Sequence, residues 1–283
     1  MQAGFGYYRV GQAVSRSLPR AAAAALSRAL AAGYARFSPD LPALTANMRA
    51  ALGSPAEDAA VRGAARRLIV NYADYLVDLF YSDHLDRAAI AGRIRAEGLE
   101  HLDRALRSGR GAIVVSAHLG HWEIGAMALS LRGYPVNVIA LTHRDRRIDA
   151  LFLARRAQHG VQTIPLGRPR EALRALERGQ IVALNADRPF GDRLVEVPFF
   201  GRRLPFPSGY ARLSLKAGAP VLPTFFVGDG KGGYVLRIRP PLAGPGEDGI
   251  VRAFIAEVEA AVRRDPTQWY IFQRFDETPQ WPV

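Results

Sequence analysis

Cysteine is absent from this sequence of 283 residues. Its absence excludes disulfide bonds, thiolate metal sites and a cysteine nucleophile, so covalent catalysis would need another kind of side chain. Lysine is scarce too, since Lys216 and Lys231 are the only two among 38 basic residues. A GC-rich genome would explain the preference for arginine. The formal net charge of +12 still favours an anionic partner: a phospholipid surface, a phosphorylated cofactor, an acidic carrier protein or nucleic acid.

The sequence also lacks an uncharged apolar run of the ~18 residues that a membrane-spanning helix requires. The alanine-rich segment from Met1 to Arg36 comes closest, but Arg20 and Arg28 interrupt it. Arg28 would also fall inside the apolar core of a signal peptide, so we expect neither feature. We expect a helix that lies on an anionic membrane face, with arginines along it and apolar anchors at Tyr7, Tyr8, Leu18, Leu26 and Leu30. An ordinary helix packed on the body of the protein is the alternative.

Helical periodicity dominates the first third of the chain. Apolar residues recur at a period of 3.6 over Pro42–Leu52 and Pro55–Tyr81, and another helix is predicted over Leu99–Arg107. Ser54 is a plausible cap for the second of these helices, because proline is favoured at the first helical position. We therefore predict a mainly helical N-terminal layer over residues 1–108.

After Gly109 the pattern changes to alternating strands and helices. Strands are predicted over Ala112–Ser116, Val136–Leu141, Val161–Pro165, Ile181–Asn185, Val221–Val227 and Tyr234–Ile238. Helices are predicted over Trp122–Leu131, Arg147–His159, Pro169–Arg178, Ser208–Ala217 and Gly249–Arg264, and the stretch between Asn185 and Ser208 is expected to be irregular. Such alternation predicts an α/β fold with a mostly parallel central sheet flanked by helices. Residues 109–283 would form this core, and the whole chain a single domain.

The stretch from Gly111 to Gly125, GAIVVSAHLGHWEIG, is the leading candidate for an active centre. If His118 ends the strand and Glu123 lies in the first turn of the next helix, the two side chains can converge. The helix dipole would keep Glu123 ionised, so that it could orient His118 as a base. The spacing alone carries little information, because a histidine and an acid here could simply cap and pack. His121 is the competing base.

Several segments resemble the bacterial lipid A biosynthesis acyltransferase family, which includes phosphatidylinositol mannoside acyltransferases. SAHLGHWEIG is similar to its His-X4-Asp/Glu motif, with His121 where asparagine is usual. NMRAALG resembles its early asparagine-containing helix, and GLEHLDRALRSGRGAIVVSAH the approach to its motif. Ala186-Asp187-Arg188 with VPFFGRRLPFPSGYARLSLKAGAPVLPTFF resembles its second conserved block, and QWYIFQRF its C-terminal end. The resemblance covers roughly Asn47 to Phe275 and implies a fold like that of glycerolipid acyltransferases.

The resemblance assigns roles to three residues. His118 would be the catalytic base that deprotonates an acceptor hydroxyl, and Glu123 its partner. The mannoside branch places the orienting carboxylate at the position that resembles Asp187, so both acids are candidates, with Glu123 ranked first. Asp187 follows a predicted strand, which in a parallel sheet would bring it to the same edge as His118. The simpler interpretation is that Asp187 forms an ion pair with Arg188 or caps a loop.

Further residues are predicted to bind substrate. The family's functional arginine matches Arg156 best, beside Arg155, and would bind a donor phosphate or polarise a thioester oxygen. Arg188 belongs to the second conserved block, and Arg168, Arg202 and Arg203 are further phosphate candidates. Phe199 and Phe200 could line an acyl-chain groove together with Val197, Leu204 and Phe206, although all five could equally be core.

The predicted function is transfer of a fatty acyl group from a thioester of acyl carrier protein or coenzyme A to a hydroxyl of a glycolipid or phospholipid. The hydroxyl would attack directly, without an acyl-enzyme, a bound cofactor or a metal. The enzyme would sit peripherally on the cytoplasmic face of the inner (plasma) membrane, because the single N-terminal span typical of the lipopolysaccharide enzymes is not evident. The alternatives are a thioesterase or esterase and a non-catalytic basic module for membrane or nucleic acid. Without a basic tail, we expect no nucleic-acid partner.

Overall fold

A computed structural model describes residues 5–53, 56–84, 86, 88, 92–189, 191 and 193–277, without the side chains of residues 5, 7 and 16. The predicted cap at Ser54 and the anchor at Tyr7 therefore lie outside the described part. The N-terminal layer contains α1 (Phe5–Ser17), α2 (Arg20–Tyr34), α3 (Leu41–Leu52) and α4 (Asp58–Phe80). The single helix expected over residues 1–36 is two helices, because Pro19 adopts an extended conformation between them.

The central sheet has seven strands in the order β1-β9-β8-β2-β5-β3-β4. All neighbouring pairs are parallel except β8 and β9, which are antiparallel. The strands are β1 (Ile94–Glu97), β2 (Ala112–Ser116), β3 (Val136–Ala140), β4 (Gln162–Pro165), β5 (Ile181–Asn185), β8 (Val221–Gly228) and β9 (Tyr234–Ile238). The predicted α/β fold with a mostly parallel sheet is confirmed.

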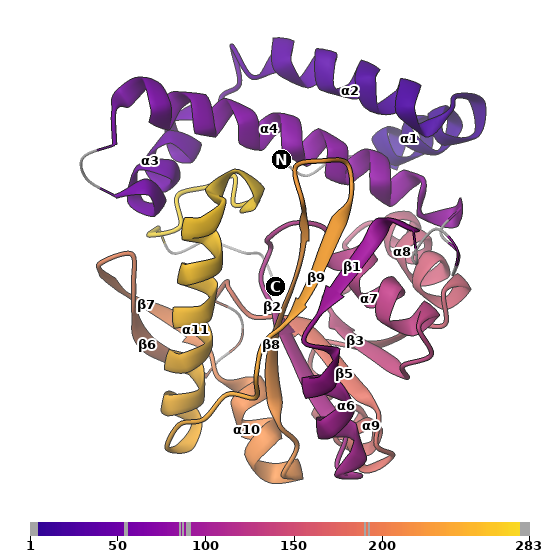
Figure 1. Ribbon diagram of the computed structural model, residues 1–283, viewed down its shortest axis with the longest axis vertical. Coiled ribbons are helices and arrows are strands. Elements are labelled where there is room, and N and C mark those ends of the chain that lie inside the picture. Colours follow the sequence, from indigo (N-terminus) through magenta and orange to yellow (C-terminus); the bar gives the residue numbers. More distant parts are fainter. Residues whose placement is uncertain are drawn as a thin grey trace.

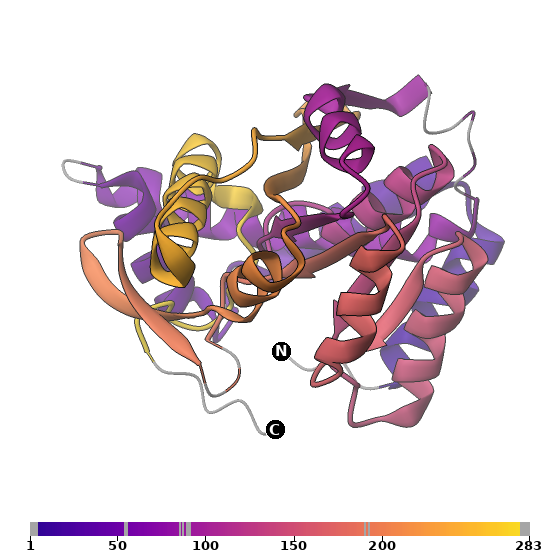
Figure 2. The same ribbon diagram turned by 90° about the horizontal axis from the view of Figure 1, so that it is seen from below.

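Helices cover both faces of this sheet (Figure 2). Successive side chains of a strand point to opposite faces of the sheet, so each face needs a cover of its own. In strand β2, Ile113 and Val115 belong to one hydrophobic core, and Ala112 and Val114 belong to the other. The first core includes residues of α9 (Pro169–Glu177), α10 (Gly209–Ala217) and α11 (Gly246–Arg264), and the second residues of α6 (Leu99–Arg107) and α7 (Trp122–Leu131). Helix α8 (Arg146–Gln158) packs on β4 and against α1.

Two elements were missed by the sequence-based prediction. Strand β1 lies within the stretch predicted to be helical, so the sheet begins before residue 109. An antiparallel hairpin, β6 (Leu194–Phe199) and β7 (Arg202–Pro207), occupies the stretch expected to be irregular. The hairpin stands apart from the central sheet (Figure 2). Its prolines obscure the strand pattern, and its turn forces Phe200 to a φ of 46°.

The N-terminal helices lie along one end of the molecule, with α4 above the sheet (Figure 1). Tyr75 of α4 stacks on Trp122, with ring centroids 4.7 Å apart, and is also in contact with His121 and Tyr270. Trp122 begins α7, directly after the predicted catalytic stretch. The N-terminal layer therefore covers the sheet edge where the candidate active-site residues lie.

Candidate active site

His118 and Asp187 meet at the carboxyl ends of two neighbouring parallel strands. Ser116 of β2 is in register with Asn185 of β5, and each chain then continues for two residues to His118 and Asp187. The Nδ1 atom of His118 lies 2.7 Å from Oδ1 of Asp187, and the backbone N–H of His118 donates to Oδ2 at 2.9 Å. One carboxylate thus fixes both the ring and the backbone of the histidine.

The loop after His118 is held by backbone contacts to two other segments. Gly120 adopts a φ of 65°, and a Cβ atom there would lie 2.2 Å from the carbonyl oxygen of Phe226. The N–H groups of Gly120 and His121 donate to the carbonyls of Gln268 (2.8 Å) and Phe226 (2.7 Å). The carbonyl of His118 itself accepts from Tyr270 N–H at 2.8 Å. Because the turn needs glycine, the SAHLGH sequence specifies this loop geometry directly.

Burial and the nearby charge of Arg188 favour a neutral imidazole at His118. Burial lowers the pKa of His118 below its usual range and the positive charge of Arg188 lowers it further, against the opposing effect of Asp187. Burial would raise the pKa of Asp187, but the His118 ring and backbone and the Arg188 charge hold it below its usual range. An ionised carboxylate can only accept, so Nδ1 carries the proton and Nε2 is left as a base. The His118 side chain is 21% exposed, whereas that of Asp187 is fully buried.

Glu123 forms a different pair. Its carboxylate accepts two hydrogen bonds from Arg156 of α8, from Nε at 3.1 Å and from one terminal nitrogen at 2.5 Å. Both side chains are about nine-tenths buried. The other terminal nitrogen of Arg156, Nη1, donates no hydrogen bond to any of the described residues. Glu123 is near enough to influence the pKa of His118, although it is the weakest of the influences found.

The prediction that Glu123 rather than Asp187 contacts His118 is therefore wrong. Glu123 was ranked first as the partner of His118, but the carboxylate that touches the imidazole is Asp187. The reason is that Arg156 already occupies both oxygens of Glu123, and β5 presents Asp187 in register with β2. Convergence of Asp187 on the same edge was predicted, because it follows a strand of a parallel sheet.

The other predicted arginines lie in three different settings. Arg155 is buried, with Nε 3.4 Å from Asp83 and its guanidinium over the ring of Phe80. Arg168 is on the surface, in an ion pair with Glu171. Arg188 lies beside the His118–Asp187 pair and donates to the carbonyl of Tyr270 at 3.1 Å. Of these three, only Arg188 is placed to contact a substrate at the dyad.

A cavity that is open to solvent adjoins the dyad, and the cavity together with the open space at its mouth measures about 510 Å³. It runs between the β6–β7 hairpin and the C-terminal segment, and its lining residues are Asp187, Arg188, Pro189, Phe199, Leu204, Pro205, Phe206, Trp269, Ile271, Gln273, Arg274, Phe275, Asp276 and Glu277. Phe199, Leu204 and Phe206 were predicted to line a groove. Phe200 does not line it but packs on Phe199, Trp269 and Phe275, and Val197 is buried core.

The C-terminal contribution to the cavity was not foreseen. QWYIFQRF had been noted as a family-like segment without a role, since neither spacing nor periodicity reveals where an irregular segment will lie. Trp122 was missed too: its ring meets the His118 ring edge to face, with centroids 5.0 Å apart. An aromatic residue directly after the loop was the available signal.

His121 is not placed as a competing base, because it is buried with Nδ1 3.2 Å from Asp78 of α4. Asp78 also accepts from Arg20 of α2 and from Tyr234 of β9, so this cluster ties the N-terminal layer to the sheet. Within the described part of the chain, no group of three or more histidine and acidic side chains is arranged to hold a metal ion.

A neutral histidine that a buried carboxylate orients at the edge of a parallel sheet is typical of an α/β enzyme that uses a general base. The sequence profile of the bacterial lipid A biosynthesis acyltransferase family matches residues 5–275. The chain therefore belongs to this family, and it is an O-acyltransferase.

Individual relatives agree with this assignment. The chain is 28% identical over 283 residues to a phosphatidylinositol mannoside acyltransferase of Mycolicibacterium smegmatis, covering 97% of this chain and 90% of that protein. It is 30% identical to the protein of the same name from Mycobacterium tuberculosis, over 65% of this chain and 58% of the relative. A lipid A biosynthesis palmitoleoyltransferase of Escherichia coli is 27% identical, over 65% of this chain and 61% of the relative.

Proposed function

We propose that this enzyme transfers a fatty acyl group from a thioester of acyl carrier protein or coenzyme A to a hydroxyl of a glycolipid or phospholipid at a membrane surface. The observation that carries the proposal is the His118–Asp187 pair, 2.7 Å apart, at the end of a partly apolar cavity. The names of the relatives support a glycolipid acceptor over a phospholipid one. No bound cofactor takes part in the proposed reaction.

The reaction needs one base and one oxyanion stabiliser. Nε2 of His118 takes the proton of the acceptor hydroxyl while its oxygen bonds to the thioester carbon. The carbon–sulfur bond then breaks, and the departing thiolate takes the proton back from the imidazolium. Asp187 orients the ring and stabilises its transient charge. Nη1 of Arg156, which is free of Glu123, is the proposed donor to the developing oxyanion.

The cavity suits the acyl chain of the donor. Phe199, Phe206, Trp269 and Phe275 supply apolar surface, while Arg188 lines the cavity next to Asp187 of the dyad. Arg202 and Arg274 both bind Asp276 at this cavity, and they are half exposed. We propose that these arginines and Arg188 attract the phosphates that acyl carrier protein and coenzyme A donors have in common.

Transfer is tested with purified full-length protein, labelled palmitoyl thioesters of both carriers and extracted lipid acceptors. We expect labelled lipid to form, and His118→Ala to lower the rate by about 10³-fold or more. His101→Ala, which removes a partly exposed histidine of α6, is the matched control and should leave the rate unchanged. Full activity of His118→Ala would contradict the mechanism. Release of free fatty acid at the same rate without an acceptor would identify a hydrolase instead.

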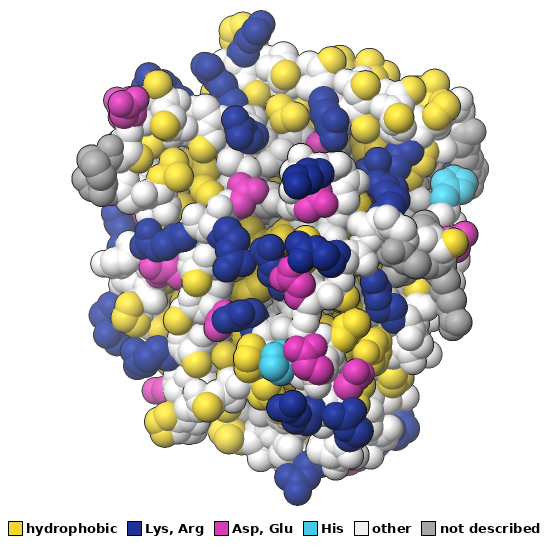
Figure 3. All heavy atoms as spheres, viewed as in Figure 1, with side chains coloured by type: hydrophobic (Ala, Val, Ile, Leu, Met, Phe, Trp, Pro, Cys, Tyr) yellow, Lys and Arg dark blue, Asp and Glu magenta, His cyan; other side chains and the backbone are white. Residues whose placement is uncertain are grey.

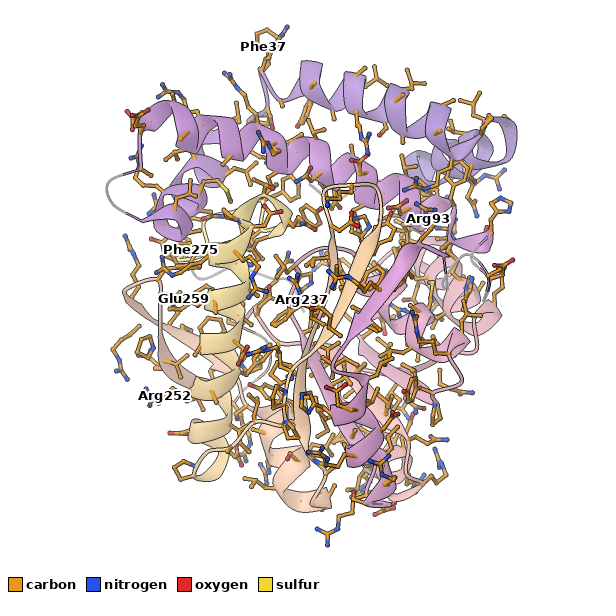
Figure 4. The ribbon with its side chains drawn as sticks, viewed as in Figure 1. Phe37, Arg93, Arg237, Arg252, Glu259 and Phe275 are labelled. Atoms are coloured by element: carbon orange, nitrogen blue, oxygen red, sulfur yellow. The ribbon has the colours of Figure 1, made fainter. Side chains whose placement is uncertain are left out.

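We further propose that α2 and the residues after it rest on the cytoplasmic face of the inner (plasma) membrane. Leu26, Leu30, Tyr34 and Phe37 are exposed there, Phe37 by 87%. Apolar atoms gather along this edge in Figure 3, and Phe37 projects beyond the ribbon in Figure 4. Among the described residues, none of the helices is long and apolar enough to cross a bilayer. An apolar ridge on a chain of net charge +12 suits peripheral binding to anionic lipid.

Vesicle sedimentation tests this attachment. The double variant Leu30→Ser/Phe37→Ser should bind anionic vesicles about tenfold more weakly, because each side chain loses apolar area that would enter the lipid. Leu215→Ser is the control, since Leu215 is 53% exposed on α10 at the opposite end of the molecule. Equal losses in both variants would mean that α2 is not the contact surface.

A further inference from the structure

The chain from residue 269 to residue 277, here called the C-terminal strap, forms one side of the cavity although it is neither helix nor ladder strand. Seven of the cavity's lining residues belong to it, from Trp269 to Glu277. Apart from an isolated bridge between Trp269 and Leu119, it has no place in the described sheets. Beyond Tyr270, whose N–H donates to the carbonyl of His118, its path therefore depends on side chains that bind its backbone.

One buried side chain provides most of these bonds. Asn47 of α3 is 1% exposed. Its Nδ2 donates to the carbonyls of Ile271 (3.0 Å) and Gln273 (2.8 Å), and its Oδ1 accepts from the N–H of Phe275 (3.1 Å). The single amide thus binds three alternate residues of the strap. Ile271, Gln273 and Phe275 are also cavity-lining residues.

The contacts of the strap show what this clamp controls. The ring of Phe275 packs against Phe199 (5.8 Å) and Trp269 (5.8 Å), which both line the cavity. Phe275 lies close to α3 and the β6–β7 hairpin in Figure 4. At its other end the strap reaches the dyad, where Tyr270 N–H donates to the carbonyl of His118. A shift of the strap near residues 271–275 would therefore change the cavity wall before it changed the dyad.

We infer that Asn47 is a positioning residue that sets the fit of the acyl chain by holding the C-terminal strap against the cavity. This inference rests on the proposed function, in which the cavity holds the chain of the donor. It assigns acyl-chain binding to a side chain from the N-terminal layer that does not itself line the cavity. Loss of the amide leaves three strap groups unbonded, so the strap relaxes and the aromatic wall loses its contact with the chain.

A second asparagine offers a matched control. Asn71 of α4 also reaches from the N-terminal layer to the C-terminal segment, where its Nδ2 donates to the carbonyl (3.1 Å) and hydroxyl (2.8 Å) oxygens of Thr267. Thr267 precedes the strap and does not line the cavity. Asn71→Ala therefore removes the same chemistry from the same pair of segments without releasing the cavity wall.

The experiment measures palmitate binding to the full chain and the kinetics of palmitoyl transfer. For Asn47→Ala we expect the Kd for palmitate and the KM for the palmitoyl thioester to rise about tenfold, with kcat changed less than about threefold. Asn71→Ala should change neither constant. The Asn47→Asp side chain keeps the shape of the amide and the oxygen that accepts from the N–H of Phe275. It has no N–H group to donate to the carbonyls of Ile271 and Gln273. It should resemble Asn47→Ala.

Several results would overturn the inference: equal behaviour of the Asn47 and Asn71 variants, a fall in kcat without a rise in KM, or no palmitate binding by the unaltered protein. If both Asn47 variants fail to fold, Asn47 stabilises the whole chain rather than the cavity wall, and the inference is wrong. If the protein binds palmitate, and this binding depends on Asn47, but it transfers no acyl group, then the proposed function is wrong and the role of Asn47 in palmitate binding still holds. The binding measurement thus separates the two failures.

Discussion

The two acid–base pairs of the site differ in how freely their protons can move. His118 and Glu123 come from the same short stretch after β2, and each pairs with a residue from later in the chain, Asp187 after β5 and Arg156 of α8. His118 meets Asp187 with its own ring partly exposed, whereas Glu123 is bound at both oxygens by Arg156 in a buried pair. The imidazole of the first pair can accept a proton through Nε2, whereas the carboxylate of the second is held by a charged guanidinium.

This difference shows how one short segment, which runs from the end of β2 into α7, can present two acid–base groups with separate tasks. Burial would lower the pKa of Arg156, but Glu123 outweighs it and the guanidinium stays charged. The pair is therefore a fixed electrostatic element, and it leaves Asp187 as the carboxylate that orients the base. If the assignment is correct, changes to the first pair should affect chemistry most, and changes to the second should affect folding and charge stabilisation.

The largest effect should come from Asp187→Asn. The amide keeps the shape but can offer Nδ1 an N–H, which would hold His118 in the tautomer with its proton on Nε2, where the base must act. We expect kcat to fall by about 10³- to 10⁴-fold, with little change in KM for the donor. Single-turnover measurement of acyl transfer would isolate the chemical step.

Asp103→Asn is the control for this substitution. Asp103 also accepts a hydrogen bond, from the hydroxyl of Tyr134 at 2.7 Å, but it belongs to α6. Its replacement should leave kcat within about twofold. A loss in Asp187→Asn no larger than that in Glu123→Gln would reverse the order of the two carboxylates.

The second prediction separates the structural and chemical roles of the Glu123–Arg156 pair. Glu123→Gln leaves a buried guanidinium without its counter-charge, so we expect a loss of about 3 kcal/mol in the free energy of unfolding. The double variant Glu123→Gln/Arg156→Gln removes both charges and should recover most of that stability. Its transfer rate should stay about 10- to 100-fold low, because the proposed donor to the oxyanion is gone. Denaturant unfolding and initial rates measure the two quantities.

Recovery of both stability and rate in the double variant would show that the pair is only structural. Arg147→Gln/Asp145→Asn is the surface comparison, since that ion pair is exposed and links residues two apart. It should change stability by less than about 1 kcal/mol.

The positions of the strands along the chain were visible in the sequence because the apolar runs that mark them are local. Ala112–Ser116 and Ile181–Asn185 are short apolar runs that end in polar residues, and parallel strands bring their carboxyl ends to one edge. From this, the arrival of Asp187 at the same sheet edge as His118 could be predicted, although Glu123 was ranked first as the partner of the histidine. The sequence could not show that Glu123 binds Arg156 instead of His118, because this bond joins α7 to α8 and depends on side-chain geometry.

The cavity was harder to predict, since both of its walls lack a periodic signal. Strands β6 and β7 contain Pro198, Pro205 and Pro207, which are unusual within strands. The C-terminal strap takes its path from bonds to Asn47, more than two hundred residues earlier in the chain. Such long-range side-chain bonds leave no mark in a local pattern.

The smallest predicted effect is a shift in the pH dependence of transfer. The base must be unprotonated, so kcat/KM should rise with pH through the pKa of His118, which burial and the nearby charge of Arg188 hold below the ordinary value of 6.5. Arg188→Gln removes a positive charge that disfavours the imidazolium. The acid limb of the profile should therefore move to higher pH. Rates measured across pH 4.5 to 8, at about 0.15 M salt, would detect it.

Arg168→Gln provides the matched control for this shift, because Arg168 is an exposed arginine paired with Glu171 at the start of α9. It should leave the acid limb in place, although both variants lower the net charge by the same amount. A KM change in Arg188→Gln would reflect its proposed contact with the donor and does not affect the argument, which rests on the position of the limb. A limb that stays in place or moves downward in Arg188→Gln would mean that another group titrates. The histidine beside Asp187 would then not be the base that limits transfer.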